Sequence, residues 1–175
     1  MRYLKDRGFI LKRINFGDSD RYITIFTKYN GKIEVVAKGV RKITSRRASA
    51  VELLNLIEFQ TVKGPRNYIL TETKLIDPFG ELKNDLTNIE KVFTTCELID
   101  AIMPFGQKHT DVFELMSRAL SQMRDERTLV LFQAKLLILL GYWDRRVSFR
   151  SSSHVQHHIA QILERRLKTR SIFEV

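Results

Sequence analysis

The sequence predicts an α+β protein in which a small N-terminal β-barrel, residues 1–78, precedes an α-helical domain, residues 79–175. Five short runs with β-strand patterning lie before Pro78, and apolar residues at helical spacing fill the chain after it. The charge divides at the same place: residues 1–77 hold 16 Lys and Arg against 8 Asp and Glu, and residues 78–175 hold 14 against 12. The N-terminal part is therefore the candidate for binding a polyanion.

The first strand is expected at Gly8–Ile14, where β-branched and apolar residues run up to a turn-rich cluster. A β-hairpin follows, built from Arg21–Lys28 and Lys32–Ala37. Asn30-Gly31 joins the two strands, and this pair is the one most favoured in two-residue type I′ turns.

A two-residue loop would place Phe26 opposite Val35. One face of the hairpin would then carry Tyr22, Thr24, Phe26, Ile33, Val35 and Ala37. The opposite face carries the charged residues, so the first is expected to face the core, with Tyr22 and Phe26 inside.

Two further strands are expected at Leu54–Lys63, whose leucines could also serve a helix, and at Asn67–Leu75. Five short strands with a long connection after the third favour a closed oligonucleotide-binding (OB) barrel. The strand face and loops of such barrels usually bind single-stranded nucleic acid. Tyr29 and Tyr68 are the aromatic residues freest to stack on bases, although both could be ordinary exposed tyrosines.

A basic segment follows the third strand, and it has no acidic residue between Glu34 and Glu52. It contains Lys38, Arg41, Lys42, Arg46 and Arg47, and the expected connection between the last two strands adds Lys63 and Arg66. A run of this kind can be an ordinary solvated loop. The alternative, which we favour, is that these seven cations contact the backbone of DNA, because phosphate contacts carry no sequence information directly.

The chain after Pro78 reads as four amphipathic helices. Apolar spacing predicts one from Asp85 to Met103, one that Thr110 can cap, one at Asp125–Leu140 and one that follows Ser151-Ser152-Ser153. The third is apolar nearly all round and is expected at the centre of a bundle, with Gly141 as its C-terminal stop.

Catalytic and metal-binding patterns are weak. The chain has no Gly-rich phosphate loop and no G-x-S-x-G elbow, so no enzymatic activity and no cofactor is expected. Asp18 and Asp20 could hold a metal, but a turn between strands explains them as well. His154, His157 and His158 cluster where a helix begins, yet without a third convincing ligand a surface cluster is favoured over a metal site.

The single Cys96 lies in a helical pattern and is expected to be an inert core thiol, which suits a reducing, cytoplasmic setting. No apolar run approaches the ~18 residues of a membrane span. We therefore expect no membrane association.

Several segments together resemble the bacterial RecO family of DNA-repair proteins. They are Gly8–Leu11, Asn15–Arg21, Thr24–Thr27, Gly31–Arg41, Leu75–Asp77, Leu136–Tyr142 and Leu163–Lys168, with Lys63-Gly64. The resemblance implies an OB-fold domain followed by a helical domain. It also implies a recombination mediator that binds single- and double-stranded DNA, anneals complementary strands without ATP, and acts with RecR and the single-strand-binding protein SSB to load the recombinase RecA.

The resemblance further implies that the acidic, Phe-ended tail of SSB docks on the helical domain. Such a tail needs an apolar slot rimmed by cations, and the candidates are Arg165, Arg166 and Lys168, which lie beside Ile162, Leu163 and Leu167. These cations could equally coat a solvated helix end. Many family members also carry a four-cysteine zinc module before the last helix, but here only Trp143–Ser153 lie there, without cysteine. This departure predicts a form without the zinc module.

Two other functions remain open from the sequence. The first is a stand-alone OB-fold RNA-binding or translation-associated protein. The second is an enzyme acting on nucleic acid, which the missing catalytic patterns disfavour.

Overall fold

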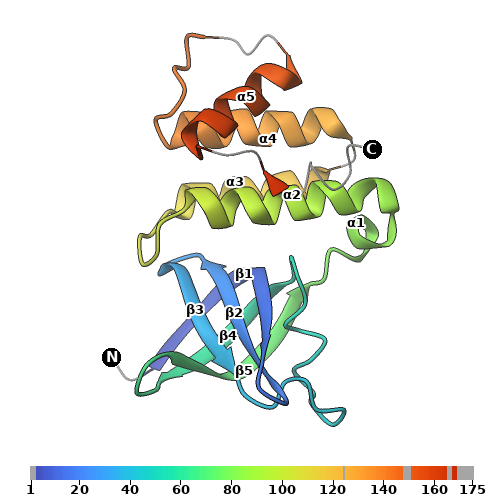
Figure 1. Cartoon of the computed structure of the whole chain (residues 1–175), viewed down its shortest axis with the longest axis vertical. Coiled ribbons are helices and arrows are strands. Elements are labelled where there is room, and N and C mark those ends of the chain that lie inside the picture. Colours follow the sequence, from blue (N-terminus) through green and yellow to red (C-terminus); the bar gives the residue numbers. More distant parts are fainter. Residues whose placement is uncertain (1–2, 124, 148–150, 165–166, 169–175) are drawn as a thin grey trace. The chain divides into compact units, whose positions relative to one another are not determined.

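The computed structural model describes residues 3–123, 125–147, 151–164 and 167–168 (Figure 1). The described part contains β1 (Tyr3–Phe16), β2 (Asp20–Thr27), β3 (Gly31–Ala37), β4 (Leu56–Lys63), β5 (Tyr68–Asp77), α1 (Gly80–Asn84), α2 (Leu86–Ile102), α3 (Thr110–Gln122), α4 (Glu126–Leu139) and α5 (Ser152–Ile162). The chain divides into two compact units, one within residues 1–80 and 103–109 and the other within 81–102 and 110–175. A compact unit is not necessarily a domain that folds alone, so the domain limits at residues 78 and 79 stay a prediction.

The five strands close a barrel in the order β1-β2-β3-β5-β4 (Figure 1). Neighbouring strands are antiparallel except β3 and β5, which are parallel. The long strand β1 serves two partners, because Tyr3–Phe9 pairs with β4 and Gly8–Phe16 pairs with β2. A register shift between Ile10 and Lys12 bends β1 between these partners. This is an OB-like barrel followed by helices, and it confirms the predicted fold class.

The β2–β3 hairpin corrects a prediction from the sequence. Thr27 pairs with Gly31, so residues 28–30 form a three-residue loop, and Phe26 lies opposite Lys32 rather than its predicted partner. Gly31 has a φ of +68°, whereas Asn30 is absent from the described residues with positive φ. The predicted type I′ turn is therefore wrong.

Side chains around the loop explain the longer connection. The Thr27 hydroxyl accepts a hydrogen bond from the Asn30 amide (2.9 Å) and donates to the Gly31 carbonyl (2.8 Å). The buried Asp6 carboxylate accepts from the Tyr29 amide (3.0 Å) and from the Asn30 side chain (2.7 Å). These bonds satisfy polar groups that a two-residue loop would have to arrange differently.

The changed register shifts the pairing by an odd number of residues, so a different set of β2 residues shares a face with each β3 residue. Val35 and Ala37 lie in the core as predicted, but Ile23 and Ile25 of β2 accompany them there. The barrel core contains Ile10, Ile23, Ile25, Val35, Ala37, Val40, Ala50, Val51, Ile57, Phe59 and Leu70. Tyr22 was predicted inside but instead packs on Phe16, with ring centroids 4.8 Å apart. Phe26 is fully buried, as predicted, but it does not belong to this core cluster.

The helical unit is built around α4, which contacts α2, α3 and α5. Asp125 caps its N-terminus by accepting from the Thr128 amide (2.8 Å). Bonds from the Thr128 amide and hydroxyl lower the pKa of the Asp125 carboxyl below its usual value. At the other end, Gly141 adopts a φ of +76° and donates to the Ile138 carbonyl. The four predicted helices and the central place of α4 are confirmed, whereas the short α1 was not predicted.

Two smaller predictions can also be followed. Cys96 is buried in α2, as expected of a core thiol. Within the described ranges, no helix is long and apolar enough to cross a membrane.

Candidate nucleic-acid interface

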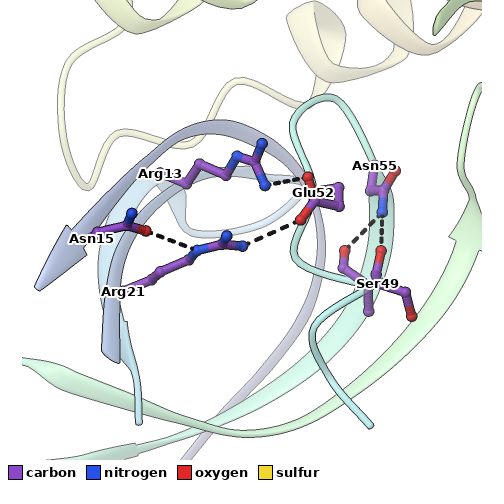
Figure 2. Close-up of polar contacts among 7 residues, drawn as sticks. Arg13, Asn15, Arg21, Ser49, Glu52 and Asn55 are labelled. Carbon is purple, nitrogen blue, oxygen red and sulfur yellow. Dashed lines mark hydrogen bonds and ion pairs between the residues drawn. The ribbon is translucent and has the colours of Figure 1, made fainter. Parts of the chain in front are cut away.

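The connection between β3 and β4, residues 38–55, is here called the basic loop. Its apolar residues anchor it, since Val40, Ala50, Val51 and Leu54 are buried. The Asn55 side chain also holds the loop by donating to the carbonyls of residues 49 and 50, at 2.8 and 2.9 Å (Figure 2). The loop is therefore fixed at both ends, and its middle is exposed to solvent.

The first half of the basic loop is fastened to the turn between β1 and β2. The Gly39 amide donates to the Asp20 carboxylate (2.7 Å), and the Arg41 amide donates to the Ser19 carbonyl (2.9 Å). The Arg41 guanidinium reaches the Gly17 carbonyl (3.1 Å). Asp20 thus has a structural role, and the described residues contain no cluster of three or more His, Cys, Asp or Glu that could hold a metal.

The cations of the basic loop fall into two groups. Lys38, Lys42 and Arg46 are exposed, and no described carboxylate pairs with them. Arg41 is also exposed and uses one side-chain donor on a carbonyl, which leaves its other donors available. These four cations form a positive surface that phosphates could approach.

Arg47 differs from its neighbour Arg46. Its guanidinium donates to the Leu70 carbonyl (2.5 Å) and to the Lys38 carbonyl (2.8 Å), and it is only half-exposed. The bond to Leu70 ties the basic loop to β5, and the bond to Lys38 joins two parts of the loop. A phosphate contact by Arg47 stays a prediction, but the observed contacts of its guanidinium are structural.

The acidic residue of the basic loop, Glu52, is engaged on the barrel (Figure 2). Its two carboxylate oxygens meet Arg13 from β1 and Arg21 from β2, the latter at 3.2 Å. Arg21 also donates to the Asn15 side chain at 3.2 Å. Glu52 is therefore shared by two arginines outside the loop, and within the described part of the chain no carboxylate pairs with the exposed cations Lys38, Lys42 and Arg46.

Lys63 and Arg66 lie at the connection between β4 and β5, and both are exposed. Among the described contacts, no hydrogen bond or ion pair joins either to the basic loop. Arg47 reaches Leu70, which follows Arg66 by four residues, at most about 13 Å along the chain. Their part in one continuous surface with the loop stays a prediction.

The two tyrosines proposed for base stacking have different surroundings. Tyr68 packs against the barrel core, so its ring is not free. Tyr29 is exposed, but the ammonium groups of Lys28 and Lys108 lie 5.6 and 5.3 Å from its ring. It also lies before β3, whereas the basic loop begins after β3.

The predicted SSB-tail candidates are mostly not described. Arg165 and Arg166 lie outside the described residues. Lys168 is exposed, and its backbone amide donates to the Glu97 carboxylate at 2.8 Å. The helical unit does contain a groove of about 670 Å³ along α3 and α4, which combines apolar walls with cations. Its lining includes Leu115, Leu131, Phe132, Ile138 and Leu139 together with Arg118, Lys135 and Arg145.

The histidine cluster holds an aromatic ring. Trp143 packs against both His154 and His158 in edge-on contacts, with ring centroids 5.0 and 4.7 Å away. The His158 Nε2 atom also forms a hydrogen bond with the Tyr142 carbonyl at 2.7 Å. The helical spacing that could have suited a metal therefore serves packing of the tryptophan.

A closed barrel of OB topology with an anchored, cation-rich loop is the architecture of an oligonucleotide-binding class of protein. Comparison with known families is more specific. Residues 1–79 match the family described as recombination protein O N terminal, and residues 84–143 match recombination protein O C terminal. The chain belongs to the RecO family.

Curated relatives carry the name DNA repair protein RecO. The protein of Acetivibrio thermocellus is 31% identical over 147 residues, that of Clostridium acetobutylicum 33% over 147, and that of Symbiobacterium thermophilum 30% over 140. These alignments cover 81%, 81% and 77% of this chain, but 59%, 60% and 55% of the relatives. The chain thus spans little more than half the length of the curated relatives it matches.

Proposed function

We propose that the chain binds DNA through the basic loop and acts in recombinational DNA repair. In this role it anneals complementary single strands and, with RecR, helps to load RecA onto SSB-coated DNA. The observation that carries the proposal is the set of exposed cations, Lys38, Arg41, Lys42 and Arg46, on an anchored loop of an OB barrel. Membership of the RecO family supports DNA repair as the setting.

Binding through these cations is independent of sequence, because they contact phosphates rather than base edges. Each phosphate contact on a single strand contributes about −0.7 to the slope of log affinity against log salt. Four contacts therefore give a slope of about −3. Duplex DNA carries the same backbone groups, so the loop also binds double-stranded DNA.

Annealing needs no nucleotide in this scheme. The main obstacle is repulsion between two polyanions, which the loop reduces by neutralising phosphates. Stacking and pairing of the new duplex are then favourable, by about 1.4 kcal/mol for each base-pair step. The protein has to bring strands together rather than supply energy.

The groove along α3 and α4 suits the SSB tail better than the cations first suggested for it, Arg165, Arg166 and Lys168. An acidic peptide with an apolar end requires apolar walls and a basic rim, and the groove combines Leu131 and Leu139 with Arg118, Lys135 and Arg145. Replacing either Arg118 or Lys135 singly with Glu should markedly weaken binding of a tail peptide in fluorescence anisotropy. Arg127→Glu is the matched control, because Arg127 is exposed on α4 but does not line the groove. Equal loss with the control would show that only net charge matters.

The test of the main proposal is annealing of complementary oligonucleotides, one labelled, with EDTA present and no nucleotide. The parent protein should accelerate annealing, and a Lys42→Ala, Arg46→Ala double variant should be slower. A parent protein that binds neither strand, or a purely RNA-specific one, would contradict the proposal.

A further inference from the structure

The outer face of the β1–β2 hairpin carries an exposed apolar patch. Ile14 is 50% exposed and Phe16 51% exposed, although both lie within β1. Ile14 pairs with Tyr22 across the hairpin, and the rings of Phe16 and Tyr22 touch at a tilt of 59°. The alternation of strand side chains puts the three on one face.

This patch is not needed to close the barrel. The pairing of β1 with β4 ends at Phe9, so residues 12–16 pair only with β2. None of the three residues belongs to the barrel core cluster. A single exposed apolar residue is ordinary, but the exposed Ile14 and Phe16 beside the half-buried Tyr22 form a surface suited to an apolar or aromatic ligand.

Cations stand at two sides of the patch. The Arg41 guanidinium is bound to the carbonyl of Gly17, the residue that follows Phe16. Lys12 is exposed and lies two residues before Ile14, on the same face of β1. The patch therefore adjoins the basic loop and lies between positive groups.

We propose that Phe16, supported by Tyr22 and Ile14, is a stacking surface for the bases of single-stranded nucleic acid. This inference rests on the proposed function and adds a base contact to its phosphate contacts. Bases stack on aromatic rings whatever their sequence, so the surface does not compromise a protein that acts on any strand. Duplex bases are already stacked on one another, and the surface therefore favours unpaired DNA over duplex.

The experiment measures affinity by anisotropy for three probes: oligothymidine, an abasic strand of the same length, and a duplex. Phe16→Ala should weaken oligothymidine binding by at least about fivefold, the lower end of what one base–aromatic stack contributes. Affinity for the abasic strand and the salt slope should not change, because no phosphate contact is lost. Phe16→Leu, which keeps apolar bulk but removes the ring, should resemble the alanine variant. Tyr29→Ala should leave all three affinities unchanged.

The outcomes separate the two proposals. A parent protein that binds none of the probes refutes the proposed function. If the parent binds and both Phe16→Ala and Phe16→Leu bind oligothymidine as tightly as the parent, the stacking surface alone is refuted. Equal weakening for oligothymidine and the abasic strand also refutes it. If thermal melting shows that Phe16→Ala is unfolded, the conservative Phe16→Leu decides by the same criteria.

Discussion

Arg46 and Arg47 are neighbours with the same side chain, yet the structure gives them opposite environments. Arg47 donates to the Leu70 and Lys38 carbonyls, whereas Arg46 is exposed and has no described carboxylate partner. We expect Arg47→Ala to destabilise the barrel and Arg46→Ala to weaken DNA binding. Comparing the two substitutions holds the loss of charge constant.

The magnitude follows from the bonds. A hydrogen bond from a charged donor contributes about 1.5–3 kcal/mol. Water can replace part of both bonds at this half-exposed site, so we take about 2 kcal/mol for the pair rather than the full sum. Arg46→Ala should change stability by less than about 0.5 kcal/mol, as is usual at the surface. For DNA binding, Arg46→Ala should make the salt slope shallower by about 0.7.

Urea unfolding provides the stability assay. With a slope near 2 kcal/mol per molar urea, a loss of about 2 kcal/mol lowers the midpoint by about 1 M. Trp143 is the single tryptophan and lies in the helical unit. Its fluorescence therefore reports on that unit, while far-UV circular dichroism also follows the barrel.

The result that would refute this assignment is equally specific. If Arg47→Ala had the same urea midpoint as the parent and also a shallower salt slope, the Arg47 guanidinium would be a phosphate contact. The carbonyl bonds would then contribute little to holding the basic loop.

Three further outcomes are expected. In urea unfolding, Gly31→Ala should be at least about 2 kcal/mol more destabilising than Gly17→Ala. Both glycines have positive φ, but a Cβ at Gly31 would lie 2.1 Å from the Gln107 carbonyl oxygen, whereas a Cβ at Gly17 would meet nothing within 4 Å. Glu52→Gln should lower the unfolding free energy by no more than about 1 kcal/mol, with a smaller effect at high salt, because its ion pairs are partly exposed; an effect that salt leaves unchanged would argue for packing instead. Elemental analysis should find no stoichiometric zinc, since the chain has a single cysteine; one zinc per chain, lost together with the fold on chelation, would contradict this.

Local patterns were enough to predict the fold class, the presence of five strands and the helices α2 to α5, but not α1 or the Tyr3–Arg7 part of β1. Alternating apolar residues located the strands of the barrel, and spacing by three and four located α2 to α5. These signals succeed because each side-chain direction follows from the backbone period of its own element. Gly141 was predictable as a helix stop for a similar reason, since the positive φ after a helix is a local requirement.

The register of the β2–β3 hairpin could not be read in this way. Asn-Gly favoured a two-residue turn, but Thr27 and the distant Asp6 bind the loop in its three-residue form. The difference moved Tyr22 from the expected core to the outer face. Phe16, which contacts it there, was not among the aromatic residues that the sequence suggested.

The candidate interface shows the same division. The sequence by itself determined that five cations lie between Glu34 and Glu52. Only the tertiary structure decided that Arg47 binds the Leu70 carbonyl, 23 residues further along the chain, while Arg46 remains exposed. It also decided that Glu52 meets Arg13 and Arg21 rather than its neighbours in the loop. Charge is a property of the sequence, but the partner of each charge depends on which distant groups the fold brings within hydrogen-bonding distance.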